Sequence, residues 1–259
     1  MSKDSIEKMS GHWVLAKVGK KVLRPGGKQM TDKMIKLLDI NSTDHVVEFA
    51  PGLGYTANIT LQKNPKTYIG IDLEEAIVKD LNLKFGNEKT TFKLANAAQT
   101  ELDNESQTKV YGEAMLTMHA DHRKSEIIQE AFRILKNQGI YAIHELALKP
   151  DLISEEIKKE IQRELAETMK VNARPLTIEE WKNRLINEGF EIITIETAEM
   201  HLLEPSRLID DEGFNGFMTI VKNIATQPEI RERVIKMKKI FKKYEEHLCA
   251  TVIMAKKTT

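Results

Sequence analysis

Two glycines and an acidic residue farther along the chain have types and a spacing suited to ligand binding. Gly52 and Gly54 follow the apolar run 45–49 and precede a stretch that is compatible with a helix. Because glycine has no side chain, the backbone of such a turn can approach a ligand closely. Asp72 stands 20 residues after Gly52, at the end of a second apolar run, where a carboxylate can accept hydrogen bonds from both hydroxyls of a ribose. The pattern therefore indicates a ligand that contains adenosine.

Glu48 bears on which adenosine ligand the turn would hold. The spacing Gly52-x-Gly54-x-x-Ala57 also satisfies the fingerprint of a dinucleotide-binding turn. Glu48 lies four residues before Gly52, at the carboxyl end of the first apolar run. Its negative charge would repel a pyrophosphate and would suit a ligand that carries an amine and a sulfonium. Glu48 therefore favours a ligand of that kind, and a nicotinamide cofactor stays an alternative.

The elements around this turn predict an α/β fold. Short β-rich runs alternate with helical patterns, which indicates a parallel sheet covered by helices on both faces. The expected strands are 45–49, 67–71, 91–94, 110–115, 139–145, 191–198 and 248–256, and the expected helices between the first five are 55–62, 74–85 and 123–135. Another helix is expected to open with a capping box at Thr177 and Glu180.

Helical patterns also lie outside this core. Residues 6–39 have apolar residues four apart, interrupted at the segment 24–27, and the second helix there is expected to begin at Thr31. About fifty residues of helical character separate the last two expected strands, which is too long for a plain loop. We expect one structural domain in three segments: a helical cap at 1–43, a ligand-binding core at 44–150, and the remaining strands with a helical insertion at 151–259.

Composition and charge exclude several classes of protein. Lys and Arg number 39 and Asp and Glu also number 39, so the formal net charge is zero, which disfavours nucleic acid as the main partner. The single Cys249 cannot form an internal disulfide or supply a thiolate metal site alone, and this fits a reducing compartment. No stretch approaches the ~20 apolar residues that span a bilayer, and the first ten residues lack a signal-peptide core. We expect a cytoplasmic protein without a membrane partner.

The chain from about residue 44 to residue 145 resembles the class I S-adenosylmethionine-dependent methyltransferases, and its texture is similar to small-molecule enzymes such as those of quinone biosynthesis. Segment 46–54, Val-Val-Glu-Phe-Ala-Pro-Gly-Leu-Gly, looks like the first family motif, and 68–72, Tyr-Ile-Gly-Ile-Asp, like the second. Segments 93–97 and 132–145 resemble the adenine-side motif and the fifth strand with its preceding helix and turn. The resemblance implies a doubly wound, seven-stranded Rossmann-like sheet with an antiparallel last strand.

The resemblance also implies S-adenosylmethionine as cofactor and methyl transfer to a small-molecule acceptor. The residues expected to bind the cofactor are Glu48, Ala50, Gly52 and Gly54 at the methionine end, Asp72 and Leu73 at the ribose, Asn96 and Ala97 at the adenine, Glu113 beside the methionine portion and Arg24 at its carboxylate. Ala50 stands at the family's first glycine and Asn96 at its usual aspartate. We expect Ala50 to fit a turn that does not need a positive φ, and Asn96 to keep a hydrogen-bond acceptor.

Methyl transfer asks little of the protein beyond positioning, because a sulfonium methyl group is already a strong electrophile. The sequence has no Gly-x-Ser-x-Gly elbow, no His-Glu-x-x-His pair and no P-loop, and no metal is expected. A base would help if the acceptor carries a proton. The candidates, near the ends of the fourth and fifth strands, are Glu113, His119, His144 and Glu145. His12 and Trp13 are expected to close the site, and segments 151–174 and 200–247 to build the acceptor pocket.

Three alternatives stay open. A nicotinamide-dependent oxidoreductase shares the turn and the ribose acid. A sensor or scaffold that binds the ligand without turnover is suggested by Ala50 and Asn96. Methylation of RNA or protein is a third alternative. The sequence leaves open the identity of the acceptor, the atom that is methylated, and the oligomeric state, for which a homodimer is one option.

Overall fold

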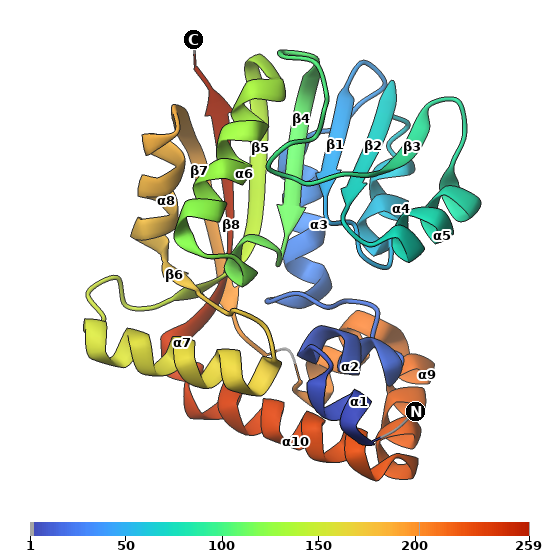
Figure 1. Cartoon of the computed structure of the whole chain (residues 1–259), viewed down its shortest axis with the longest axis vertical. Helices are drawn as coiled ribbons and strands as arrows, with labels where there is room; N and C mark the ends of the chain where they lie inside the picture. The colour runs from blue at the N-terminus through green and yellow to red at the C-terminus, as the bar shows by residue number, and fades with distance from the viewer. Residues whose placement is uncertain (1–2, 202, 259) are drawn as a thin grey trace.

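The computed structural model describes residues 3–201 and 203–258, and its centre is a mixed sheet with the strand order β3-β2-β1-β4-β5-β8-β7 (Figure 1). The strands are β1 (His45–Phe49), β2 (Thr67–Asp72), β3 (Thr90–Leu94), β4 (Gln107–Glu113), β5 (Leu135–Leu148), β6 (Leu176–Thr177), β7 (Phe190–Glu199) and β8 (Leu248–Lys257). The first five are parallel, and β8 runs antiparallel to both β5 and β7. The predicted α/β sheet with its antiparallel last strand is confirmed; the two-residue β6, which pairs with β5, is an addition to the seven expected strands.

Helices cover both faces of the sheet because successive strand residues point to opposite sides. Val47 belongs to the core that α6 (Asp121–Ile134) and α8 (Ile178–Asn187) bury, whereas its neighbour Val46 belongs to the core under α3 (Gly27–Leu38) and α4 (Tyr55–Leu61). Helix α5 (Glu75–Phe85) packs beside β2 and β3. The capping box of Thr177 and Glu180 opens α8 as predicted. The prediction for Thr31 is wrong, because α3 begins at Gly27 and Thr31 lies buried inside it.

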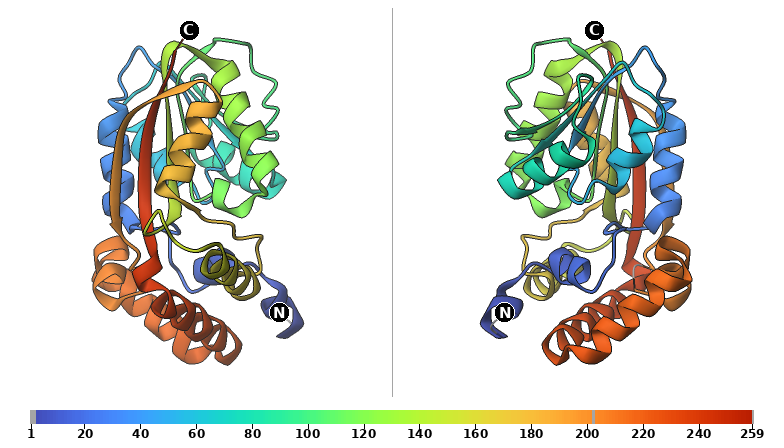
Figure 2. Two further views of the ribbon diagram at one scale, coloured as in Figure 1. Left: turned by 90° about the vertical axis from the view of Figure 1, so that its left-hand side faces the viewer. Right: turned by 90° about the vertical axis from the view of Figure 1, so that its right-hand side faces the viewer.

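A separate layer of helices lies across the carboxyl ends of the parallel strands (Figures 1 and 2). It consists of α1 (Lys3–Lys8), α2 (Gly11–Lys17), α7 (Glu155–Met169), α9 (Pro205–Thr226) and α10 (Pro228–Lys243). Two short 3₁₀ helices, η1 (Leu116–Met118) and η2 (Glu245–His247), follow β4 and precede β8. The layer has its own hydrophobic core, in which Val14, Ile161 and Met237 are buried together with Leu248 at the start of β8.

Buried charges tie the beginning of the chain to this layer. Arg233 on α10 is 6% exposed, and its guanidinium donates to the carbonyl oxygens of Ile6 (2.8 Å), Met9 (3.0 Å) and Thr168 (3.3 Å). A cation at these positions stabilises the carbonyl groups at the carboxyl ends of α1 and α7. Lys20 forms a buried ion pair of 2.9 Å with Asp211 on α9. Helix α2 is therefore flanked by two ties, one to α10 before it and one to α9 after it.

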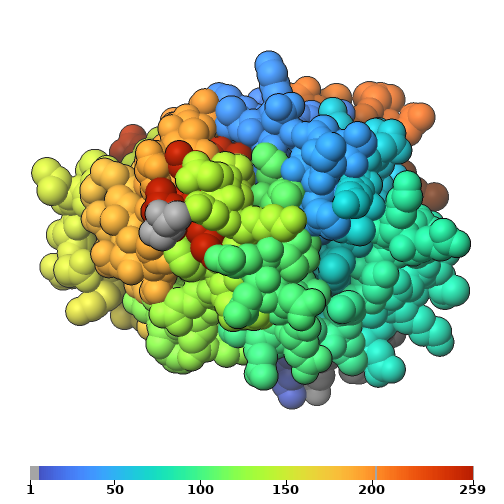
Figure 3. Space-filling view, turned by 90° about the horizontal axis from the view of Figure 1, so that it is seen from above, coloured from blue at the N-terminus to red at the C-terminus, as the bar shows by residue number. Residues whose placement is uncertain are grey.

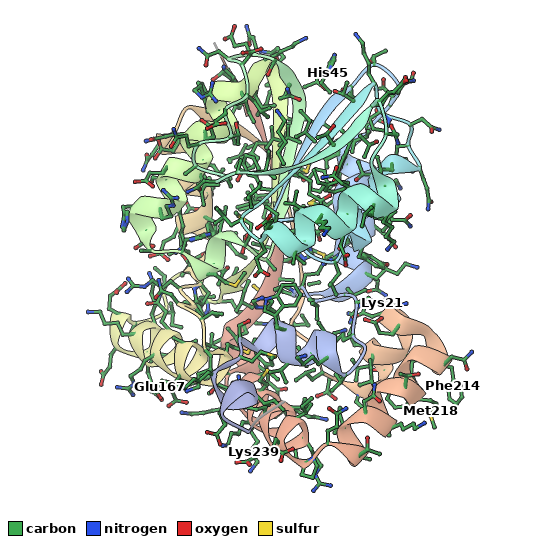
Figure 4. All side chains as sticks on the ribbon, turned by 45° about the vertical axis from the view of Figure 1, so that its right-hand side comes forward. Lys21, His45, Glu167, Phe214, Met218 and Lys239 are labelled. Carbon is green, nitrogen blue, oxygen red and sulfur yellow. The ribbon has the colours of Figure 1, made fainter. Side chains whose placement is uncertain are left out.

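The amino ends of the parallel strands lie at the opposite end of the molecule. His45, the first residue of β1, lies there, whereas Lys21 lies at the level where the sheet meets the helical layer (Figure 4). Seen from the His45 end, the strand ends and their loops form a continuous surface (Figure 3). In the part of the chain that the structure describes, no helix is long and apolar enough to cross a membrane.

Candidate functional site

A cavity of about 430 Å³ lies between the carboxyl ends of the parallel strands and the helical layer. The loops that leave β1, β2, β3 and β4 meet at this edge of the sheet, which is where open α/β sheets bind ligands. Of the residues that the sequence predicts for cofactor binding, those that line the cavity are Arg24, Ala50, Gly52, Asp72, Leu73, Asn96, Ala97 and Glu113. The cavity therefore lies at the edge of the sheet where the sequence predicts a ligand.

The glycine turn after β1 places bare backbone against the cavity. Gly52 has a φ of 52°, and a Cβ atom built on it would meet nothing within 4 Å, so its backbone faces open space. Gly54 has a φ of 75° but does not line the cavity; a Cβ atom there would lie 2.5 Å from Leu81 Cδ2. Gly52 thus exposes the turn to a ligand, whereas Gly54 lets α4 pack against α5.

Asp72 is joined directly to this turn. Its Oδ2 accepts a hydrogen bond of 3.4 Å from the amide of Gly52, and its Oδ1 accepts one of 3.0 Å from the amide of Glu74. Burial raises the pKa of Asp72 above its ordinary value. A carboxylate oxygen can accept more than one hydrogen bond, so both oxygens retain capacity for the two hydroxyls of a ribose.

Ala50 corrects one sequence expectation. Its φ is 53°, so this position of the turn does require the left-handed conformation that glycine adopts without cost and that alanine resists. The amide of Ala50 still donates to the carbonyl of Ile71 at 2.8 Å, which fixes the turn against β2. The chain therefore carries backbone strain at the position where the resembled family has glycine.

We expect Ala50→Gly to raise the free energy of unfolding by about 0.5 to 1 kcal/mol, because relief of the left-handed strain exceeds the added entropy of the unfolded chain. Urea unfolding measures the change. Ala57→Gly is the matched control: Ala57 lies buried in α4, where glycine should instead cost about 1 kcal/mol. A loss of stability in Ala50→Gly would contradict the strain.

Glu48 does not line the cavity. Its side chain accepts hydrogen bonds from the hydroxyls of Tyr68 and Tyr111, the latter at 2.7 Å, and Tyr111 also hydrogen-bonds Thr60 at 2.7 Å. The residue is 3% exposed and lies on the α3 side of β1. Burial raises the pKa of Glu48 to about 7. The hydrogen bonds from the two tyrosines oppose this rise, and the negative charge of Glu113 adds to it. Glu48 therefore belongs to a buried polar cluster beneath the turn, and we leave it out of the proposed cofactor contacts.

Glu48→Gln should remove a pH dependence of stability. The pKa of Glu48 rises from 4.5 to about 7 on folding, so between these values the folded chain holds a proton that the unfolded chain has lost. The free energy of unfolding therefore falls as the pH rises through this interval, by about 2 to 3 kcal/mol, and is level above it. Urea unfolding of both proteins at about pH 5 and about pH 8 gives the comparison. An equal fall in the variant and the natural protein would contradict this assignment.

Arg24 and Glu113 form the centre of a buried network at the end of β4. Arg24 Nη1 donates to the hydroxyls of Thr31 (3.2 Å) and Thr56 (2.8 Å). These hydroxyls in turn donate to Glu113, Thr31 to Oε2 (2.7 Å) and Thr56 to Oε1 (2.6 Å). Burial alone would raise the pKa of Glu113, but the charge of Arg24 and the hydrogen bonds of His144 and Thr56 outweigh it and lower the pKa to about 2. Glu113 is therefore a carboxylate.

His144 completes the network from β5. Its Nδ1 lies 2.7 Å from Glu113 Oε2, and its Nε2 lies 2.7 Å from the carbonyl oxygen of Pro25. Carboxylate and carbonyl oxygens only accept hydrogen bonds, so each ring nitrogen of His144 faces an acceptor. His144 is 0% exposed and does not line the cavity. The cluster thus holds the guanidinium of Arg24 at the cavity wall, where it suits a ligand carboxylate.

Glu145 and His119 occupy different surroundings. Glu145 is fully buried and accepts hydrogen bonds from the amides of Met115 (3.0 Å), Leu116 (2.8 Å) and Thr117 (3.1 Å), so it fixes the loop that follows β4. It does not line the cavity. His119 follows this loop and does line the cavity. Burial, with the charges of Arg123 and Lys124, lowers the pKa of His119. Only Glu113 and His119 of the four base candidates reach the cavity, and Glu113 is already engaged in the network.

Sequence reasoning missed the two threonines of the network. Thr31 and Thr56 lie on α3 and α4, and their hydroxyls carry the hydrogen bonds between Arg24 and Glu113. No local pattern marks a threonine within a helix as a partner for a strand-end acid. The helical segments expected to build the acceptor pocket do supply lining residues, among them Leu165 and Met169 of α7 and Phe241 of α10.

The polar groups that line the cavity fit S-adenosylmethionine and are not arranged as a set of metal ligands. Bare backbone at Gly52, the free acceptor capacity of Asp72 and the guanidinium of Arg24 correspond to its adenosine and amino-acid portions. Across residues 3–201 and 203–258, no group of three or more His, Cys, Asp or Glu residues is placed to hold a metal ion. Cys249 is buried, which raises its pKa to about 11, so it packs as a small core residue.

Known methyltransferases are similar to this chain in sequence and in fold. A family model described as a methyltransferase domain matches residues 47–143. An uncharacterized protein of Haemophilus influenzae is 35% identical over 265 residues, which cover 99% of this chain and 100% of the relative. A ribosomal RNA small subunit methyltransferase A of a Hydrogenobaculum species is 29% identical over 103 residues, and the match spans 40% of each protein. Phosphoethanolamine N-methyltransferase 2 of Haemonchus contortus, solved with phosphomonomethylethanolamine and S-adenosylhomocysteine, has a TM-score of 0.71 at 15% identity, covering 96% of this chain and 57% of that chain.

The chain belongs to the class I S-adenosylmethionine-dependent methyltransferases. Its fold matches that of solved methyltransferases, and the glycine turn at the end of β1 lies inside the matched region. It is an S-adenosylmethionine-dependent methyltransferase, and the nicotinamide-dependent oxidoreductase is set aside.

Proposed function

We propose that this methyltransferase acts on a small-molecule acceptor held in the cavity under the helical layer. The observation that carries the proposal is the continuity of one cavity: it reaches from Gly52 and Asp72 to Trp13 on α2, Met169 on α7 and Phe241 on α10. Its volume of about 430 Å³ lies within the range of about 300 to 1,000 Å³ that is typical of small-molecule sites. The part of the cavity next to α2, α7 and α10 is called its outer part here. An acceptor bound there would lie beside the cofactor and be shielded from water.

In the proposed arrangement the chain binds the cofactor along the edge of the sheet. Asp72 accepts the ribose hydroxyls with Leu73 beside it, Asn96 and Ala97 contact the adenine, and Ala50, Gly52 and Arg24 hold the methionine portion. When bound, S-adenosylmethionine supplies an electrophilic methyl group on a sulfonium. The chain's own contribution is orientation and exclusion of water. His119 is the group placed to take a proton from the acceptor, while Glu113, His144 and Glu145 position the loops around it.

RNA methylation is the rival, and it is suggested by the partial match to a ribosomal RNA methyltransferase. The zero formal net charge weighs against it, because RNA binding draws on a surplus of cations. The helical layer weighs against it too, since it covers the strand ends where a base would have to enter (Figure 2). We therefore place RNA outside the proposed function.

Transfer of a labelled methyl group tests the proposal. Purified protein is incubated with S-adenosylmethionine labelled in its methyl group and a cell extract separated into dialysable, RNA and protein fractions. We expect label in the dialysable fraction only. Asp72→Ala should abolish that signal at low donor concentration. Label confined to the RNA or protein fraction would contradict a small-molecule acceptor.

A further inference from the structure

The outer part of the cavity is walled by apolar side chains from three elements and two loops. These residues are Leu146 of β5, Leu165 and Met169 of α7, Val171 after α7, Met200 after β7 and Phe241 of α10. Trp13 adds an aromatic face from α2, with its ring centroid 5.0 Å from that of His12. Such walls stabilise the apolar part of a bound acceptor, whereas a charged group placed against them would lose its solvation.

The charged residues that line the cavity are engaged elsewhere or lie at its rim. Arg24 and Glu113 face one another across 3.6 Å in the buried network. Asp72 and Glu74 lie at the end of β2 beside the glycine turn. Arg123 pairs with Glu126 through a hydrogen bond of 2.5 Å. Lys21 is exposed, at the level where the sheet meets the helical layer (Figure 4). No buried cation among the described lining residues is therefore left to hold a phosphate or carboxylate of the acceptor.

Two histidines are among the polar residues that line the cavity. His12 on α2 and His119 after η1 both line the cavity. Burial lowers the pKa of His12, and burial together with the charges of Arg123 and Lys124 on α6 lowers that of His119. Near neutral pH both rings are uncharged, and an uncharged imidazole has one nitrogen that accepts a proton. His119 lies just beyond the loop that follows β4 and lines the same cavity as Glu113.

We propose that the acceptor is an uncharged, largely apolar compound whose aromatic ring carries a hydroxyl group, and that this hydroxyl lies against His119. The inference rests on the proposed function and narrows its substrate class. The hydroxyl oxygen forms a bond to the methyl carbon while the carbon–sulfur bond breaks with its electron pair on sulfur, and the hydroxyl proton passes to the imidazole of His119. The products are a methyl ether, S-adenosylhomocysteine and a protonated histidine that returns its proton to water.

Binding measurements separate this class from charged acceptors. The full-length protein, saturated with S-adenosylhomocysteine, is titrated in a calorimeter with 4-propylphenol, 4-propylbenzoate and phosphoethanolamine. We expect 4-propylphenol to bind at least about tenfold more tightly than 4-propylbenzoate, because the carboxylate loses its hydration without gaining a cation. Trp13→Phe should weaken the binding of 4-propylphenol. Equal or tighter binding of either charged compound overturns the inference, while retained binding of S-adenosylhomocysteine keeps the proposed function intact.

Turnover tests the role of His119. Mass spectrometry should find 4-propylphenol methylated on oxygen, and His119→Gln should slow this by about 100-fold with little change in the calorimetric affinity for 4-propylphenol. The natural protein should lose rate at acid pH as His119 becomes protonated, and the variant should lack this decline. His122→Gln, at an exposed neighbouring position, is the matched control and should behave as the natural protein. An unchanged rate and pH profile in His119→Gln would overturn the assignment.

Discussion

Asp72→Ala is expected to weaken the binding of S-adenosylhomocysteine by about 100-fold. The variant loses two hydrogen bonds from ribose hydroxyls to a charged acceptor, each worth about 1.5 kcal/mol or more, and about 1.4 kcal/mol corresponds to a factor of ten. Calorimetry on the purified protein measures the change. Asp72→Asn keeps one acceptor oxygen in the same place, so we expect an intermediate loss.

Two comparisons make this result specific. Asp80→Ala removes an exposed acid from the neighbouring helix α5 and should leave the affinity unchanged. Thermal unfolding without ligand should be nearly the same for Asp72→Ala and the natural protein, because Asp72 is only half-buried and the amides of Gly52 and Glu74 that it accepts from can bond water instead. Unaltered affinity in Asp72→Ala would contradict the proposal that Asp72 binds the ribose.

Glu113→Gln should lower the free energy of unfolding by about 3 to 5 kcal/mol near neutral pH, because it removes the single anion from a buried cluster that also holds Arg24 and His144. Since the pKa of Glu113 is lowered from 4.5 to about 2, the stabilisation that this carboxylate provides is complete above the higher value and is lost only as the pH falls toward the lower one. Urea unfolding near neutral pH measures the loss. A loss below about 1 kcal/mol would contradict the network.

The protonation of the His144 imidazole is a second measurement that Glu113→Gln should change. In the natural protein both ring nitrogens should carry hydrogen, which nitrogen NMR chemical shifts report. In Glu113→Gln the ring no longer faces a carboxylate, so we expect a neutral ring that keeps its hydrogen toward Pro25 on Nε2. Glu126→Gln, which removes an exposed partner of Arg123, should leave the His144 signals unchanged. A neutral ring in the natural protein would contradict the hydrogen-bond pattern.

Local pattern was sufficient to predict the sheet and the edge at which the cavity lies. The alternation of apolar runs with helical patterns places the parallel strands within a few residues of their observed bounds, and the glycines with Asp72 mark the edge at which they end. The capping box at Thr177 depends only on residues three positions apart and was predicted in full. Signals of this kind are carried by neighbours in the chain, so no knowledge of strand pairing is needed.

Contacts that depend on register could not be predicted. Glu48 and Tyr111 are partners across β1 and β4, and Glu113 and His144 are partners across β4 and β5. Only the pairing decides that the first acid meets tyrosine hydroxyls instead of the cavity, and that the second meets a histidine. The positive φ of Ala50 was missed because alanine does not signal that conformation as glycine does.

The ties between the two ends of the chain have a consequence for biosynthesis. Arg233 bonds the carbonyl of Ile6, 227 positions earlier, and Lys20 pairs with Asp211, 191 positions later. A chain emerging from the ribosome can form β1 and the glycine turn early. The helical layer that covers the proposed acceptor part of the cavity is complete only after α9 and α10 have been made. Contacts of such long sequence separation form slowly. Newly made molecules should therefore gain affinity for the methyl donor before they gain any for the acceptor.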